Sequence, residues 1–258
     1  MLSVAERHKY IIDTLNKQGF LRIADIANEL GFTKVTIRKD IKTLEDNGIL
    51  FKTHGSARLL NPQVSDTNVQ IKDTINSETK HNIAIKACDL INDVDSIIIA
   101  SGSTIYAFAE EIIKKHWANL NIVTPYVRLG MLFSEIDDIS VFQLGGMIHK
   151  KSCSAYGEEA LKALDDCICS KVFFGVDGID IECGITTSTI EEAKLTRKMM
   201  KSASKNIILA DSSKFGQHGF GRICALEDID TIITDDKISK QMISLIEEIG
   251  INLIIVKS

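Results

Sequence analysis

The sequence has no long hydrophobic run. Its apolar runs, such as residues 97–100 and 253–256, are far shorter than the roughly 20 residues that a membrane-spanning helix requires. The first fifteen residues interleave charged and apolar side chains, so they lack the continuous apolar core of a secretion signal. We therefore expect a chain that does not enter a membrane and that works in the cytoplasm.

Proline and paired cysteines are also scarce. Two prolines and 16 glycines among 258 residues, with 45% hydrophobic residues, exclude a fibrous or low-complexity protein and favour a globular one with a core. None of the six cysteines forms a Cys-x-x-Cys pair, and no histidine stands at zinc-ligand spacing beside Cys167 and Cys169. We expect reduced thiols, no structural metal and no cofactor.

The charges are distributed unevenly along the chain. Residues 1–60 hold ten basic and seven acidic side chains, a net charge of +3, whereas residues 61–258 hold twenty basic and twenty-eight acidic ones, a net charge of −8. The segment after residue 60 is polar and contains Pro62, as linkers often do. The sequence thus predicts a basic domain over 1–60, a linker over 61–76 and an acidic domain over 77–258.

The basic domain has the pattern of three helices followed by a hairpin. Val4 to Gln18 places Val4, Tyr10, Ile11 and Leu15 near one face, and Gly19 ends this first helix. A second helix over 22–30 ends at Gly31, and Thr33 can cap a third that runs to about residue 47, with Val35, Ile41 and Leu44 facing the core. Two short helices separated by a glycine turn are typical of a helix-turn-helix.

The outer face of the third helix is polar and cationic, which suits the major groove of DNA. Residues 48–59 alternate around Gly55-Ser56 and are predicted to form a hairpin, a wing whose cations could hold phosphates. The alternative to DNA binding is that this helix face and the hairpin are ordinary solvent-exposed surface. The candidate DNA-binding residues are Arg22, Thr33, Lys34, Thr36, Arg38, Lys39, Lys52, His54 and Arg58.

The acidic domain alternates short apolar runs with longer amphipathic segments. The runs lie at 97–100, 122–123, 141–144, 172–176, 207–210, 232–233 and 253–256, and the helical segments lie at 103–115, 189–204 and 236–249. Continuous apolar runs separated by helices predict a mostly parallel α/β sheet with helices on both faces.

Polar residues follow several of these predicted strands, where ligands of open parallel sheets bind. The turn after residue 100 is rich in hydroxyls and opens a helix, so it could hold an anion, although a serine that merely caps the helix would look the same. Lys214 could neutralise a phosphate, and two aspartates could accept hydrogen bonds from a sugar. The candidate ligand-binding residues are Ser101, Gly102, Ser103, Thr104, Gly145, Gly146, Asp177, Asp180, Thr187 and Lys214.

The basic domain contains the spaced motif Arg7-x3-Ile11-x3-Leu15 followed by Thr33-x2-Thr36-Ile37-Arg38-Lys39-Asp40-Ile41, and further short motifs lie at residues 53–57, 144–146, 175–180, 184–187, 191–193 and 211–216. The first resembles the DNA-binding signature of the DeoR family of bacterial transcription regulators, and the others resemble motifs of the same family. It implies a winged helix-turn-helix joined to a sugar-phosphate sensor similar in fold to ribose-5-phosphate isomerase. It also implies a repressor of a carbohydrate-metabolism operon, with double-stranded operator DNA and a phosphorylated sugar as partners.

Three positions depart from the family pattern. Ser56 stands in place of a usual glycine in the wing, Ala100 in place of a usual aspartate, and Thr124-Pro125-Tyr126 in place of Thr-Asn-Ser. The changes at Ala100 and Pro125 remove polar groups that the resemblance places beside the sugar.

Two other functions fit parts of the sequence. The acidic domain could be a sugar-phosphate isomerase or deaminase, with Asp177 or Asp180 as the proton-transfer base. It could also serve only to join subunits. Because an isomerase has no need of a DNA-reading unit, we expect a regulator without enzymatic activity, assembled as a homo-oligomer, a dimer or tetramer that matches paired operator half-sites.

Overall fold

A computed structural model describes residues 2–18, 20–47, 49–53, 55–59 and 68–258 of the chain. The chain forms two compact units, one of Met1–Gln63 with Phe215–Gln217 and one of Val64–Lys214 with His218–Ser258. Among the described residues, no helix is long and apolar enough to cross a membrane.

The first unit is a three-helix domain with a small antiparallel sheet. Its helices are α1 (Val4–Gln18), α2 (Ile23–Leu30) and α3 (Lys34–Asp46), and its strands are β1 (Phe20–Arg22), β2 (Leu50–Thr53) and β3 (Ser56–Leu59), in the order β1-β3-β2. Gly31 ends α2 at a φ of +67°, and its N–H bonds back to the carbonyls of Ala27 and Asn28. The predicted winged helix-turn-helix is confirmed, with β1 as an additional strand that the sequence did not reveal.

A compact apolar core holds the three helices together. Ile11 and Leu15 of α1 are fully buried, as predicted, but Val4 and Tyr10 are largely exposed. On α3 the prediction was wrong at Val35, which is 72% exposed, because Ile37 takes the core position instead. Ile37, Ile41 and Leu44 follow the three- and four-residue spacing of one helix face.

The second unit is built on a seven-stranded sheet. Its strands, listed in spatial order, are β15 (Asn252–Val256), β14 (Thr231–Asp235), β12 (Ala203–Leu209), β9 (Cys169–Phe174), β4 (Ser96–Ile99), β5 (Leu120–Thr124) and β6 (Ile139–Gln143). All six neighbouring pairs are parallel. Each predicted apolar run therefore lies in or at the end of one of these strands.

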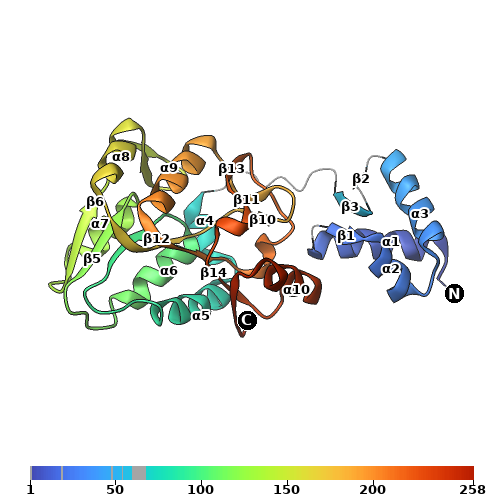
Figure 1. Ribbon diagram of the computed structural model, residues 1–258, viewed down its shortest axis with the longest axis horizontal. Coiled ribbons are helices and arrows are strands. Elements are labelled where there is room, and N and C mark those ends of the chain that lie inside the picture. The colour runs from blue at the N-terminus through green and yellow to red at the C-terminus, as the bar shows by residue number, and fades with distance from the viewer. Residues whose placement is uncertain (1, 19, 48, 54, 60–67) are drawn as a thin grey trace. The chain divides into compact units, whose positions relative to one another are not determined.

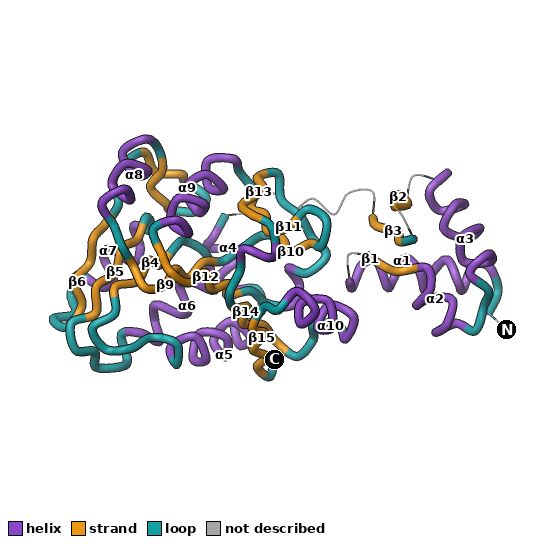
Figure 2. Tube along the Cα trace, in the orientation of Figure 1, coloured by secondary structure: helices purple, strands orange, loops and turns teal. Residues whose placement is uncertain are grey.

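Helices cover both faces of this sheet, as Figures 1 and 2 show. Helices α5 (Ser77–Cys88), α6 (Ser103–Ile112) and α7 (Val127–Phe133) share one apolar cluster with alternate strand residues such as Ile97, Ile99 and Phe173. The intervening Ile98, Val172 and Phe174 are also fully buried. Helix α9 (Ile190–Lys201) packs on β9 and β12, and α10 (Lys240–Ile249) packs on β15. The predicted α/β architecture is confirmed.

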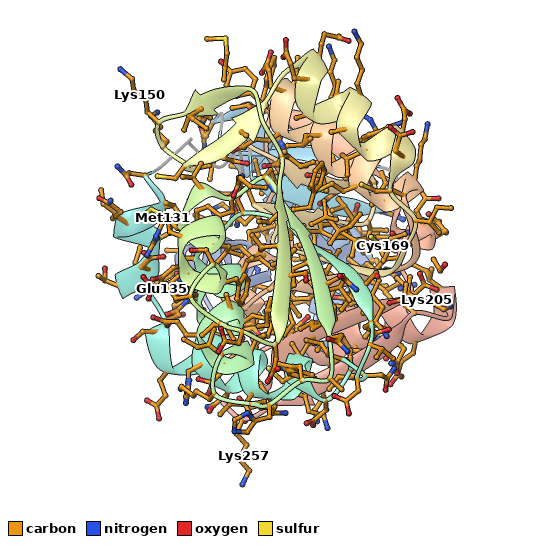
Figure 3. The ribbon with its side chains drawn as sticks, turned by 90° about the vertical axis from the view of Figure 1, so that its left-hand side faces the viewer. Met131, Glu135, Lys150, Cys169, Lys205 and Lys257 are labelled. Atoms are coloured by element: carbon orange, nitrogen blue, oxygen red, sulfur yellow. The ribbon has the colours of Figure 1, made fainter. Side chains whose placement is uncertain are left out.

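Several smaller elements of the second unit lie outside the large sheet. They are α4 (Val69–Thr74), the hairpin of β7 (Met147–His149) and β8 (Ser154–Tyr156), α8 (Glu158–Ala163), and an antiparallel sheet of β10 (Gly178–Asp180), β11 (Gly184–Thr187) and β13 (Gly221–Cys224). Single 3₁₀ turns lie at Leu164–Asp166, Ser212–Lys214 and Leu226–Asp228. Figure 3 shows the side chains of Met131 on α7, of Glu135 just after α7 and of Lys150 just after β7 on the outer surface.

The segment predicted as a linker contains one of these elements. Residues 69–74 form α4, whose Val69 is buried in the apolar cluster of the second unit. The prediction of a linker over 61–76 therefore differs from the structure at its second half. The sequence of α4 is polar and charged and shows no apolar face, because this helix is held mostly by the ion pairs of its side chains.

The strand order reverses at the centre of the sheet. The chain runs outward from β4 through β5 to β6, and then returns to β9 on the other side of β4 before running through β12 and β14 to β15. Loops at the carboxyl ends of β4 and β9 therefore diverge in opposite directions and leave a crevice between them.

Candidate functional site

The third helix of the first unit presents its cations to solvent. Lys34, Arg38 and Lys39 are exposed, while Ile37, Asp40 and Ile41 face inward. Arg22, at the start of α2, is also exposed. The structure thus places these four predicted DNA-binding side chains where a duplex could reach them.

Thr33 fixes the start of α3. Its backbone is extended, and its hydroxyl oxygen accepts a hydrogen bond of 3.2 Å from the N–H of Thr36. The Thr33 and Thr36 hydroxyls also lie 2.9 Å apart. The capping predicted for Thr33 is present, and it leaves the first turn of α3, with Lys34, in a defined geometry.

A buried ion pair sets the orientation of α3. The Arg7 guanidinium of α1 donates from Nε to Asp40 Oδ2 at 2.7 Å and from Nη2 to Asp40 Oδ1 at 2.9 Å. The same guanidinium stacks over the Phe32 ring, 4.7 Å from its centroid. Since a two-point contact of this kind fixes direction as well as distance, α3 cannot rotate about its axis without breaking it.

The wing is attached to the same helix. The backbone N–H of Lys52 donates to Glu45 Oε1 at 2.9 Å, and the Lys52 side chain is exposed. Of the other predicted wing contacts, His54 and the side chain of Arg58 lie outside the described residues.

The second unit has a pocket at the crevice beside β4 and β9. Its empty space, including the mouth that is open to solvent, is about 840 Å³. The residues that line it are Val69, Lys72, Ala100, Ser101, Gly102, Ser103, Thr104, Pro125, Lys151, Ser152, Ser154, Gly175, Val176, Asp177, Thr187, Ser188, Glu192, Leu195, Thr196, Met199, Leu209, Ala210 and Lys214. Seven of the ten predicted ligand-binding residues are among them.

The hydroxyl-rich turn opens α6 without a side-chain cap. Gly102 is the N-cap residue at a φ of +138°, a conformation that a residue with a Cβ rarely adopts. The hydroxyls of Ser101, Ser103 and Thr104 form no hydrogen bond with any residue that the structure describes. Ser103 therefore does not act as the helix cap, and the turn offers free hydroxyls and free N–H groups to the pocket.

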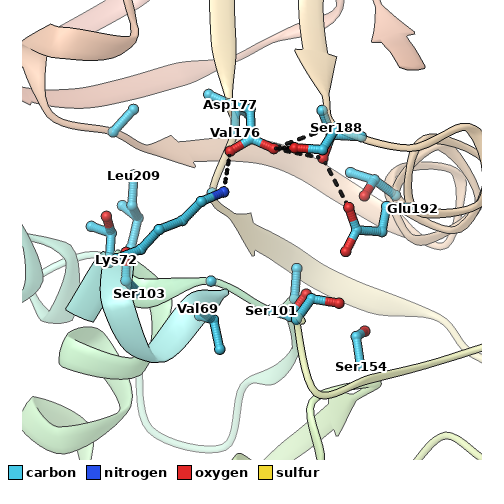
Figure 4. A pocket seen from close by; sticks show the side chains of 18 of the residues that line it. Val69, Lys72, Ser101, Ser103, Ser154, Val176, Asp177, Ser188, Glu192 and Leu209 are labelled. Carbon is cyan, nitrogen blue, oxygen red and sulfur yellow. Dashed lines mark hydrogen bonds and ion pairs between the residues drawn. The ribbon is translucent and has the colours of Figure 1, made fainter. Parts of the chain in front are cut away.

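Asp177 is the centre of a hydrogen-bonded cluster on the opposite wall (Figure 4). Its Oδ1 accepts from Lys72 Nζ at 2.7 Å, and its Oδ2 accepts from the N–H and the hydroxyl of Ser188 at 3.0 and 2.5 Å. The Thr187 hydroxyl lies 3.3 Å from both Asp177 Oδ2 and Glu192 Oε2. Burial would raise the pKa of Asp177, but Lys72 and Ser188 together hold that pKa below its ordinary value. Asp177 is therefore ionised at neutral pH.

Three lysines and two carboxylates line the pocket, so its wall carries a net positive charge. Lys72 comes from α4, Lys151 from the loop between β7 and β8, and Lys214 from the turn after β12. Lys72 is paired with Asp177. In contrast, the Lys214 ammonium makes no ion pair with any described residue, and it remains available to an anion.

Three predicted ligand-binding residues are not brought to the pocket. Asp180 is fully buried at the end of β10, where its Oδ1 accepts from the N–H groups of Glu182 and Cys183 at 2.9 and 2.8 Å. Gly145 and Gly146 follow β6 and lead into β7, and Gly146 lies against the Tyr156 carbonyl. Asp180 thus holds the turn of the β10–β11 hairpin, and the two glycines lie in a loop that joins strands of two different sheets.

Several pocket residues were missed by the sequence analysis. Lys72 lay in the predicted linker, Ser188 lay just before the predicted helix over 189–204, and Glu192 lay inside that helix. The signals that could have found the last two were the adjacent candidate Thr187 and the family motif over 191–193. Ala100 and Pro125, the two departures from the family pattern, do line the pocket.

A winged helix-turn-helix joined to an α/β unit that has a pocket is the architecture of a transcription regulator with a sensor domain. Residues 7–63 match the family described as the DeoR-like helix-turn-helix domain, and residues 75–236 match the DeoR C terminal sensor domain. The chain belongs to the DeoR family of transcription regulators.

Relatives of known name match nearly the whole chain. The chain is 32% identical over 235 residues to the lactose phosphotransferase system repressor of Staphylococcus epidermidis, covering 90% of this chain and 92% of the relative. It is 33% identical over 232 residues to the HTH-type transcriptional regulator FruR of Bacillus subtilis, itself uncharacterized, covering 90% of each. Among solved structures, ribose 5-phosphate isomerase A from Methanocaldococcus jannaschii matches with 17% identity and a TM-score of 0.40, over 54% of this chain and 55% of that one.

Family membership decides between the functions that the sequence left open. Both family matches belong to transcription regulators, and together they include both units. The protein is a DNA-binding regulator, and the alternative of an isomerase or deaminase is excluded.

Proposed function

We propose that this protein is a repressor of a carbohydrate-metabolism operon, and that a phosphorylated sugar in the pocket of the second unit modulates its binding to operator DNA. The observation that supports this most directly is the uncapped start of α6, where three hydroxyls that bond to no described residue line the same pocket as Lys214, which pairs with no described acid. A phosphate has acceptor oxygens and negative charge that match free N–H groups, hydroxyls and an ammonium. The carboxylates of Asp177 and Glu192 would accept hydrogen bonds from the hydroxyls of the sugar.

The relatives support a carbohydrate signal. One of them is named as a repressor of the lactose phosphotransferase system. The loss of polar groups at Ala100 and Pro125 leaves the phosphate end of the pocket intact, so we assign recognition of the phosphate to residues 101–104 and Lys214 and leave the identity of the sugar to experiment.

In the DNA-binding half, α3 enters the major groove with Lys34, Thr36, Arg38 and Lys39, while Arg22 and the wing hold phosphates. Operator binding in this proposal takes place in the cytoplasm and needs two helices spaced to match two half-sites, which a homodimer or tetramer provides. The domain limits of 1–60, 61–76 and 77–258 remain predictions. We assign α4, which lies within the predicted linker, to the second domain.

The effector can be identified by thermal stability. We expect one member of a panel of glucose 6-phosphate, fructose 6-phosphate, fructose 1-phosphate and ribose 5-phosphate to raise the melting temperature, and the corresponding free sugar to raise it far less. A protein that responds equally to the free sugar would contradict the assignment of a phosphate to the turn.

The phosphate contacts can be tested by substitution. Lys214→Ala and Ser103→Ala should each shift the effector concentration needed for half-maximal change of operator binding, the lysine by roughly tenfold or more, since a charge-assisted hydrogen bond contributes about 1.5–3 kcal/mol. Operator binding is measured against effector concentration for the two variants and the wild type. Superimposed response curves would place the phosphate elsewhere.

A further inference from the structure

Helix α4 is the point at which the pocket meets the chain that leads to the DNA-binding unit. It begins at Val69, directly after the segment that follows the first unit, and both Val69 and Lys72 line the pocket. Among the described pocket residues, those of α4 are therefore the nearest in sequence to β3, the last described strand of the first unit.

Apolar packing holds α4 only weakly. Val69 is its one buried residue, and Ile71 is 57% exposed. The free energy that apolar burial contributes is proportional to the area removed from water. A six-residue helix with one buried side chain therefore depends on other contacts for its position.

Polar contacts supply what apolar packing does not. Lys72 pairs with Asp177 at 2.7 Å, and Asp73 pairs at 2.8 Å with Arg128, which stacks on the Tyr106 ring 3.6 Å from its centroid. At the C-terminal end, the buried Lys80 ammonium donates to the Lys72 carbonyl and, at 2.6 Å, to the Ile75 carbonyl. At the other end, the Val69 N–H donates to the Lys151 carbonyl at 2.8 Å.

Of the α4 side chains in these contacts, Lys72 is the charged one that lines the pocket. Figure 4 shows it extended along the pocket beside Ser103, with its ammonium bound to Asp177 on the far wall. A phosphate held by the turn of residues 101–104 would carry up to two negative charges against the single charge of Asp177. It therefore competes with Asp177 for the Lys72 ammonium.

We propose that Lys72 is the residue through which an anion in the pocket acts on DNA binding: without ligand its ammonium is held by Asp177, and a bound anion draws it away and moves α4. This inference depends on the proposed function, since it assumes that the anion is the effector. It distinguishes two roles among the pocket lysines. Lys214 contributes affinity for the anion, whereas Lys72 also contributes the coupling between the anion and the operator.

The test compares Lys72→Met with Lys214→Met. For each protein, operator affinity is measured without and with a saturating concentration of each sugar phosphate of the panel, and with inorganic phosphate alone. In the wild type the ratio of the two affinities should be within the usual range of about 5–150-fold. Lys214→Met should need more ligand but keep that ratio at saturation, whereas in Lys72→Met the ratio should fall to near 1 although the ligand still binds by calorimetry.

A second variant tests the same idea without ligand. Asp177→Asn removes the charge that holds Lys72 and keeps the hydrogen-bond acceptor for Ser188, so its ligand-free operator affinity should equal that of the ligand-saturated wild type. Amide hydrogen exchange across residues 69–74 should rise in that variant to the level of the ligand-bound wild type.

The outcomes separate the two proposals. A wild type whose operator affinity no phosphorylated compound changes overturns the proposed function and this inference with it. A wild type that responds, together with a Lys72→Met protein that keeps the full ratio at saturation, overturns this inference alone. Failure of Lys72→Met to bind the ligand at any concentration would also overturn it, because the lysine would then serve affinity only.

Discussion

Two residues of α3 that stand two positions apart have opposite environments. Arg38 is exposed beside Lys34 and Lys39, whereas Asp40 is only 5% exposed and is bound to Arg7. Arg38 is thus open to solvent, where our proposal places a DNA base edge, while Asp40 fixes the orientation of the helix. Burial thus separates the charge of Arg38, which we propose contacts DNA, from the charge of Asp40, which holds the helix in place.

Replacing Arg38 by Ala should abolish most specific DNA binding. A lost arginine contact to a base typically costs about 1–3 kcal/mol, or roughly 5- to 150-fold in affinity, and relaxes specificity at that position. Mobility shifts on the DNA upstream of its own gene, at several salt concentrations, measure both effects. Lys86→Ala on α5 removes an equal charge and serves as the control, and equal binding by the two variants would refute the assignment of Arg38.

Asp177 predicts a particular dependence of stability on pH. Because its pKa in the folded protein is lowered, the ionised carboxylate stabilises the fold above its unfolded pKa of about 3.9, and this contribution is lost as the pH falls through the folded value. The difference in melting temperature between wild type and Asp177→Asn should stay constant from pH 8 to pH 5 and shrink below about pH 4. A difference that has already vanished at pH 6 would show that Asp177 is not held ionised by Lys72.

At the scale of the elements, Gly31 supports the turn between α2 and α3 through its backbone conformation alone. A Cβ at this position would meet no atom within 4 Å, but the φ of +67° is unfavourable for any residue with a side chain. Gly31→Ala should therefore lower the free energy of unfolding by about 1 kcal/mol. Gly145→Ala is a matched control, since a Cβ there is equally uncrowded and its φ is not in the left-handed region. Denaturant titration of both variants measures the difference, and equal effects would contradict the conformational explanation.

The elements that the sequence predicted share a physical property. The apolar runs of the five inner strands of the large sheet, β4, β5, β9, β12 and β14, are buried on both faces, so they are continuous and stand out in the sequence. The edge strands β6 and β15 are partly exposed but also carry apolar runs. By contrast, β1, β7, β8 and β10 have three residues each, too few to show alternation, and α4 is stabilised mainly by ion pairs between distant residues such as Asp73 and Arg128. Lys72 was missed for the same reason.

Residues of the candidate site were predictable where they follow a strong strand. Ser101 to Thr104 and Asp177 come directly after β4 and β9, the two strands at the reversal of the sheet. Asp180 was predicted to lie in the pocket because the sequence did not reveal the short strand β10, which carries the chain away from the end of β9. Val35 was predicted to face the core, but it lies two positions from the buried Ile37 and therefore on the opposite side of α3.

For the whole molecule, the two halves must affect each other equally. If a sugar phosphate changes operator affinity by some factor, operator DNA must change sugar-phosphate affinity by the same factor. Calorimetric titration of the effector, with and without saturating operator duplex, measures this factor directly, and a duplex of scrambled sequence is the control. Unequal factors would mean that effector and operator compete through more than one binding event.

The pairing of β4 with β9 has a consequence for how the protein is made. The hydrogen bond from Ser170 to the Ser96 carbonyl joins residues 74 positions apart, so the wall of the pocket is incomplete until β9 has left the ribosome. The helix-turn-helix unit is synthesised well before that, and N-terminal domains generally fold as they emerge. A premature stop codon between these points is therefore expected to yield a fragment that holds one helix-turn-helix, enough for a single half-site, but lacks the pocket. In a cell with both gene copies, such a fragment would compete with the intact regulator for its operators.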